Sequence, residues 1–156
     1  MHDDPFNLAR FLAAQAAVYA RVVEELREGS KSTHWMWFVF PQVRGLGMSA
    51  MAERFSISGV AEAAAYAAHP ILGARLRECV RLVNQLQGLS ARQIFGTPDD
   101  LKFRSSMTLF AAADSNEPLF RGALSKYYGG EPDPRTLSLL GKASAPEPVS
   151  GVRGTP

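Results

Sequence analysis

Apolar residues recur every three or four positions along almost the whole chain, and this period constrains the fold more than any other feature. The period places apolar side chains on one side of an α-helix, whereas a strand needs strict alternation, which no segment sustains. Helix-start residues such as Asp4-Pro5 and Ser90 precede periodic segments, and Gly29 and Gly129 follow two of them. The sequence therefore predicts an all-α fold: a compact single-domain bundle of about six to eight helices, several of them short, with no substantial sheet.

The same pattern sets the limits of the folded part. The first periodic segment reads as one helix from Pro5 to Glu28, and the last segment ends near Leu140. We therefore expect a single helical domain over residues 4–140. Residues 141–156 hold few apolar anchors and several prolines, which is typical of a disordered C-terminal tail.

Composition and charge exclude several classes of protein. The chain has 17 basic and 15 acidic residues, so its formal net charge of +2 gives no strong nucleic-acid signal. Cys79 is the only cysteine and the three histidines are far apart, which excludes a disulfide scaffold and predicts no metal site. No apolar stretch reaches the roughly 18 residues of a membrane span, and the acidic start at Asp3 and Asp4 is unlike a signal peptide. We expect a cytoplasmic protein without a bound cofactor.

One segment, residues 30–42, stands out because it holds both tryptophans and an unusual density of aromatic residues. A short helix capped by Thr33 and starting at His34 is expected here. The residues that could form a site are polar or aromatic: Lys31, His34, Trp35, Trp37 and Gln42. Aromatic faces suit a planar heterocycle, a lysine suits a phosphate or carboxylate, and His34 is the best candidate for a general acid or base. The turn that follows, with Gly45 and Gly47, can bring backbone N–H groups close to a ligand.

A second candidate segment is the helix expected from Pro98 to about Ala113. Lys102, Ser105 and Ser106 share one face of this helix, because they lie three and four residues apart. Together they could hold an anion or a sugar. Hydroxyls inside a helix can instead bond back to carbonyl groups one turn earlier, and this alternative stays open.

Six stretches of the chain resemble a bacterial family known as domain of unknown function 1810. They are residues 11–19, 31–42 with 45–47, 68–76, 94–96, 99–110 and 128–133. The resemblance covers about residues 4–140 and implies a single, mainly helical domain; it implies no activity. Some members of the family are labelled calpastatin, but nothing in this sequence is similar to a calpain-inhibitor repeat.

Two classes of function remain open. The first is a small-molecule site, lined by residues 34–42 and the helix around Lys102, for a nucleotide-like or ADP-ribose-like compound, with or without catalysis. The second is a non-catalytic protein-interaction or structural module in which the aromatic residues are core. The exposure of Trp35 and Trp37 separates the two, since a binding site needs aromatic surface on a concave pocket.

Overall fold

The computed structural model describes residues 3–144 and confirms the all-α fold. Within that range no strand forms, and a single parallel bridge joins Val43 to Ile57. The helices are α1 (Ala9–Ala16), α2 (Tyr19–Glu28), α3 (Met36–Val39), α4 (Ala50–Arg54), α5 (Val60–Ala68), α6 (Leu72–Gln85), α7 (Ala91–Phe95), α8 (Asp99–Ala113), α9 (Pro118–Tyr128) and α10 (Pro134–Ser144). Ten helices in the described residues exceed the six to eight that we expected.

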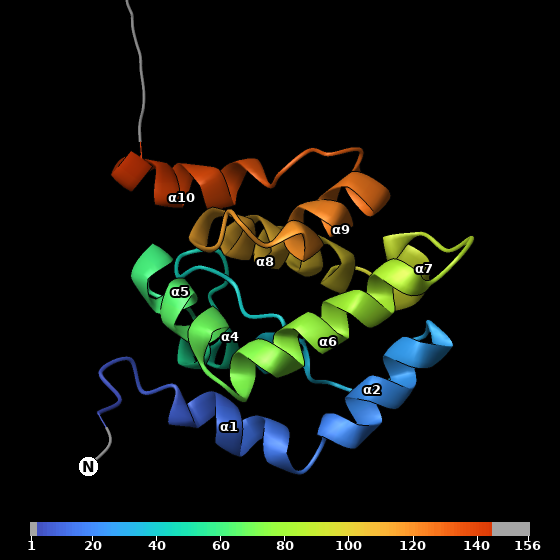
Figure 1. Cartoon of the computed structure of the whole chain (residues 1–156), viewed down its shortest axis with the longest axis horizontal. Helices are drawn as coiled ribbons and strands as arrows, with labels where there is room; N and C mark the ends of the chain where they lie inside the picture. The colour runs from blue at the N-terminus through green and yellow to red at the C-terminus, as the bar shows by residue number, and fades with distance from the viewer. Residues whose placement is uncertain (1–2, 145–156) are drawn as a thin grey trace, which may run out of the picture.

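Helix α8 is the centre of the molecule. It packs against α3, α5, α7, α9 and α10, and it is buried around most of its circumference from Phe103 to Ala111. A helix enclosed on all sides carries apolar residues all round rather than on one stripe. In Figure 1, α9 and α10 lie on one side of α8, and α1 and α2 form the opposite edge of the molecule.

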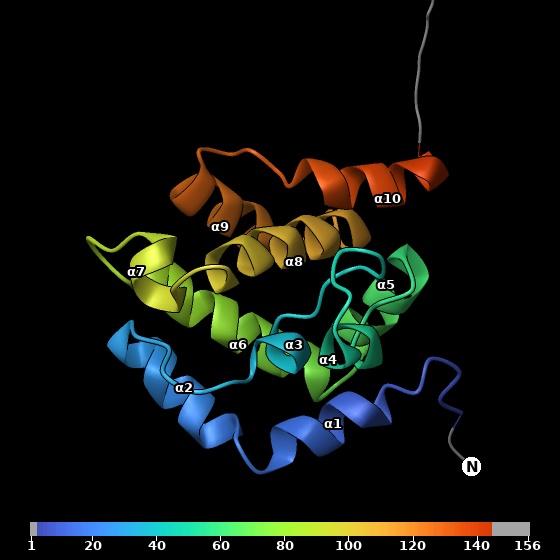
Figure 2. The same cartoon turned by 180° about the vertical axis from the view of Figure 1, so that it is seen from behind.

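The first expected helix is two helices in the structure. Helix α1 ends at Ala16 and α2 begins at Tyr19, so the single helix expected from Pro5 to Glu28 was wrong (Figure 2). The break lets α1 pack on α3 while α2 packs on α6. No proline or glycine lies between Ala16 and Tyr19, so the sequence carries no local signal for the break.

The two ends of the described chain also differ from expectation. Helix α1 starts at Ala9 and not at Pro5, although the Asp4 carboxylate accepts hydrogen bonds from the N–H groups of Leu8 (2.7 Å) and Ala9 (3.0 Å). Helix α10 continues to Ser144, past the end expected near Leu140. The rest of the predicted tail lies outside the described residues.

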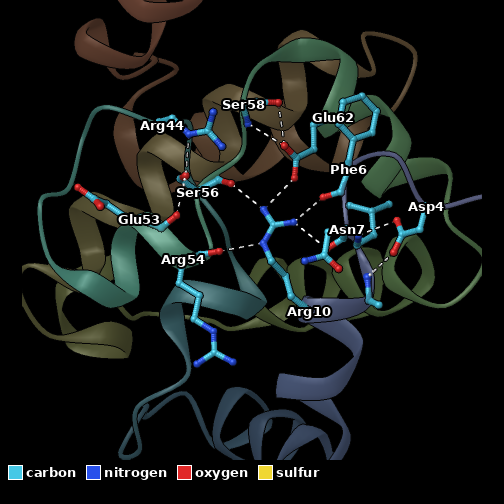
Figure 3. A network of polar contacts seen from close by, with 12 residues as sticks. Asp4, Phe6, Asn7, Arg10, Arg44, Glu53, Arg54, Ser56, Ser58 and Glu62 are labelled. Carbon is cyan, nitrogen blue, oxygen red and sulfur yellow. Dashed lines mark hydrogen bonds and ion pairs between the residues drawn. The ribbon is translucent and has the colours of Figure 1, made fainter.

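An ion pair between half-buried Arg10 and buried Glu62 fastens α1 to α5 and the segment before it (Figure 3). The Arg10 guanidinium donates to the carbonyl oxygens of Arg54 and Ser56, each at 2.8 Å, and to two carbonyls of its own helix start. It also meets the Glu62 carboxylate at 2.9 Å, and Glu62 in turn accepts from the N–H and hydroxyl of Ser58. With the carbonyls of Phe6 and Asn7, which precede α1, every N–H of the Arg10 guanidinium has an acceptor. The helical period gave no means of predicting this network.

Candidate functional site

The aromatic segment rests on a buried carboxylate at the end of α2. Oε1 of Glu25 accepts hydrogen bonds from the N–H groups of Ser32 (2.9 Å) and Thr33 (3.2 Å) and from Nε1 of Trp35 (2.9 Å). Its Oε2 accepts from the Thr33 hydroxyl at 2.6 Å. Burial alone would raise the pKa of Glu25, but these four donors outweigh it and lower the pKa to about 2. The loop after α2 is therefore organised around a carboxylate that is charged at neutral pH.

This arrangement explains why the short helix starts later than expected. The Thr33 hydroxyl is occupied by Glu25 and does not cap a helix, and α3 begins at Met36 rather than His34. His34 itself is exposed in the loop before α3. Gln15 fixes the other end of α3 by donating from Nε2 to the carbonyl oxygen of Phe38 at 2.7 Å.

The two tryptophans lie in different environments. Trp35 is 1% exposed, its ring packs near Phe40, and its N–H is bound by Glu25, so it is a core residue. Trp37 is half-buried and faces a hollow at the surface. Met36, Phe38 and Val39 are buried. The alternative that the aromatic residues are core therefore holds for Trp35 and not for Trp37.

Two neighbouring hollows open beside the loop that joins α3 to α4, which climbs toward α8 in Figure 2. The tryptophan hollow has a volume of about 450 Å³ and is lined by Trp37, Gln42, Val43, Arg44, Gly45, Gly47, Met48, Ala52, Glu53, Phe55 and Ser56. The lysine hollow has a volume of about 420 Å³ and is lined by Gln42, Leu46, Gly47, Met48, Ser49, Ala52, Pro98, Leu101, Lys102, Ser105, Asp133 and Arg135. Gln42, Gly47, Met48 and Ala52 line both, and we refer to these two adjoining hollows together as the two-part cleft.

Glycines shape the loop that forms the wall between the hollows. Gly45 has a φ of +107°, which L-residues with side chains rarely adopt. A Cβ on Gly47 would lie 2.6 Å from Cβ of Ala52, so the loop can approach α4 this closely only with glycine there. The turn expected at this place is present, and both glycines line the tryptophan hollow.

A carboxylate at the start of α8 joins two lysines. Nζ of Lys31 lies 2.8 Å from Oδ2 of Asp99, and Nζ of Lys102 lies 3.6 Å from Oδ1. The Lys31 side chain is only 7% exposed and its ammonium sits 5.1 Å from the centre of the Trp35 ring, so Asp99 serves as its buried counter-charge. Lys102 keeps 28% of its side chain exposed and holds its ammonium 5.4 Å from the Trp37 ring centre. Because Lys31 and Lys102 share the single carboxylate of Asp99, the three groups together carry one net positive charge. Lys102 is the member of this group that lines the cleft.

The sequence left two roles open for the hydroxyls of α8: contact with a ligand, or a hydrogen bond back to a carbonyl group one turn earlier. Ser105 is 2% exposed, and its Oγ lies 2.6 Å from Oε1 of Gln42 and 3.1 Å from the carbonyl oxygen of Lys102. Thr108 donates to the Arg104 carbonyl one turn earlier, as hydroxyls within helices commonly do. Ser106 is fully buried, and among residues 3–144 its Oγ has no hydrogen-bond partner.

Four of the residues chosen from the sequence meet at the cleft: Trp37, Gln42, Lys102 and Ser105. Lys31 stands behind them in contact with Asp99, whereas His34, Trp35 and Ser106 line neither hollow. Sequence reasoning missed Arg44 and Arg135, which bring further positive charge to the two hollows. Neither arginine belongs to a motif: Arg44 lies in the loop between α3 and α4 and Arg135 in the first turn of α10, so the two reach the cleft only through the packing of segments far apart in the chain.

Among the described residues, no three His, Cys, Asp or Glu side chains are grouped so that they could hold a metal ion. None of the helices between residues 3 and 144 is long and apolar enough to cross a membrane.

The structure is that of a small helical protein with a two-part surface cleft, which three basic and two acidic residues line. A family model described as "Protein of unknown function (DUF1810)" matches residues 5–140, and the chain belongs to this family. The chain is also similar to a solved structure, the conserved hypothetical protein Rv1873 from Mycobacterium tuberculosis. The two are 60% identical with a TM-score of 0.87, and the match covers 88% of this chain and 98% of the other. No protein with a curated description matches the chain.

Proposed function

We propose that the two-part cleft binds a small anionic compound that carries a planar group, of the nucleotide-like class that includes ADP-ribose. The observation that carries the proposal is the position of Lys102, whose ammonium sits 5.4 Å from the Trp37 ring centre while its side chain lines the adjoining hollow. An aromatic face beside a cation suits a ligand that combines a heterocycle with a phosphate.

Size and charge support the same class of ligand. Each hollow has a volume within the roughly 300–1,000 Å³ that small-molecule sites occupy. Arg44, Lys102 and Arg135 supply positive charge, and the acidic residues that line the cleft are Glu53 and Asp133. Asp133 is already engaged, since its Oδ2 accepts from the N–H and hydroxyl of Thr136. The balance therefore favours an anion.

Tryptophan fluorescence tests the proposal directly. AMP, NAD and ADP-ribose are titrated into the wild-type protein, and a compound stacked on half-buried Trp37 is expected to change its emission. Lys102→Ala should weaken binding by about 1.5–3 kcal/mol, or roughly 10- to 150-fold in Kd, because it removes a charged hydrogen-bond donor. Trp37→Phe should remove the fluorescence change.

Arg81→Ala is the matched control, because it also removes one positive charge. Arg81 is exposed on α6 and lines neither hollow, so its replacement should leave the Kd unchanged. The absence of a response to all three compounds at millimolar concentration would overturn the proposal. If Lys102→Ala and Arg81→Ala weakened the binding of the compound equally, the binding would be only an unspecific attraction of charges.

A catalytic role for His34 stays a prediction. The side chain is exposed and adjacent to α3, and it lines neither hollow of the cleft. The same titration on His34→Ala decides whether the histidine reaches a bound compound. A weaker Kd would place His34 at the site, and an unchanged Kd would leave it outside.

A further inference from the structure

We infer that Gln42 makes the cleft selective for a ligand with a hydrogen-bond acceptor at the junction of the two hollows, and that Ser105 is the positioning residue that aims it. The inference rests on the proposed function and deepens it. Gln42 lines both hollows, so a compound that spans the cleft must pass its side chain.

The main chain of Gln42 is held in place from the side of α5. Its carbonyl oxygen accepts from the N–H of Ile57 at 2.9 Å, and the N–H of Arg44 donates to the carbonyl of Ile57 at 2.8 Å. These two bonds form the parallel bridge between Val43 and Ile57. The base of the Gln42 side chain therefore has a fixed position although it belongs to a loop.

The side-chain amide of Gln42 is held from the opposite side by α8. Ser105 is buried on a helix that is enclosed by its neighbours, and its hydroxyl donates to Oε1 of Gln42 at 2.6 Å. Because Oε1 is occupied, Nε2 with its two hydrogens is the group left to face the cleft. Among the residues whose side chains the structure describes, no acceptor forms a hydrogen bond with Nε2.

The junction thus offers hydrogen-bond donors. The amide Nε2 of Gln42 and the ammonium of Lys102 donate only, and both border the lysine hollow. Phosphate, phosphoester and carbonyl oxygens accept such bonds, whereas an amine or guanidine group placed between Gln42 and Lys102 would meet donors with donors. The cleft therefore selects an acceptor-rich group, such as a phosphoester, at this point.

The orientation of Gln42 can be tested before any ligand is added. The order parameter of the Gln42 side-chain amide, measured by ¹⁵N relaxation, should be high in the wild type and fall in Ser105→Ala. Ser106→Ala is the matched control, because it removes a hydroxyl from the same helical turn that has no partner in the described residues. Equal order parameters in the wild type and Ser105→Ala would overturn the positioning role.

Binding of AMP then tests the selectivity with a double-mutant cycle. Gln42→Ala should weaken the Kd about fivefold, within the range of one neutral hydrogen bond, and Ser105→Ala should weaken it less. The double variant should bind no more weakly than Gln42→Ala, since Ser105 acts through Gln42. The amide protons of Gln42 should also shift downfield when AMP is added.

The failures of the two proposals are distinguishable. This inference would be overturned if the losses from the two substitutions were independent and additive, or if Gln42→Ala left the Kd unchanged. In either case the binding of AMP would still support the proposed function. A wild-type protein that binds none of AMP, NAD and ADP-ribose would overturn the proposed function and the selectivity of Gln42 with it.

Discussion

Glu25 shows how a single residue determines the shape of the aromatic segment. Its carboxylate gathers four donors from Ser32, Thr33 and Trp35, and thereby holds Trp35 in the core. Trp37, two residues further on, is consequently left as the tryptophan that faces the cleft. Nothing in the sequence indicated this role for Glu25, because its partners lie across a turn and not on its own helix.

Replacement of Glu25 by glutamine should destabilise the protein and change its response to acid. The pKa of Glu25 falls from an ordinary value of 4.5 to about 2 on folding, so its contribution is complete above pH 4.5 and is lost as the pH falls toward 2. That shift corresponds to roughly 3 kcal/mol.

Urea unfolding of the wild type and Glu25→Gln at pH 7 and pH 3 checks this expectation. The variant should be less stable at pH 7, and the difference between the two proteins should shrink at pH 3. A difference that stays the same at both pH values would show that the charge of Glu25 contributes nothing.

At the scale of helices, local signals predicted some boundaries well and others poorly. The capping box at Ser90 and the left-handed C-cap at Gly29 are present where the sequence placed them, because such caps depend on adjacent residues. The division between α1 and α2 was missed, since it serves the packing of α1 on α3 and of α2 on α6. Long-range packing overrides local preference at this point.

Arg10 is expected to matter most for the attachment of α1. Arg10→Lys keeps the charge but cannot satisfy five acceptors, so carbonyl groups near Glu62 lose their donors. The free energy of unfolding should fall by about 2–4 kcal/mol. Urea unfolding measures the loss, and Arg21→Lys, on the exposed side of α2, is the control. A loss no larger than that of the control would contradict the role of Arg10.

At the scale of the whole molecule, the period and the caps were sufficient to predict an all-α fold, whereas the cleft was only partly predictable. Trp37, Gln42, Lys102 and Ser105 were recognisable because unusual residues gather in two short segments. Arg44, Asp133 and Arg135 were not, since each reaches the cleft from a segment that the pattern of the sequence did not connect with it. A cleft lined by segments far apart in the chain becomes visible only when the helices are packed.

The indole N–H resonances of the two tryptophans provide the most direct test of the cleft. The N–H of Trp35 is bound by the Glu25 carboxylate in the core, whereas Trp37 lines the tryptophan hollow. In ¹H–¹⁵N spectra recorded while AMP or ADP-ribose is added, the Trp37 indole signal should shift in a saturable manner and the Trp35 signal should stay in place. A Trp37 signal that does not move with either compound at millimolar concentration would contradict a nucleotide-like site in this cleft.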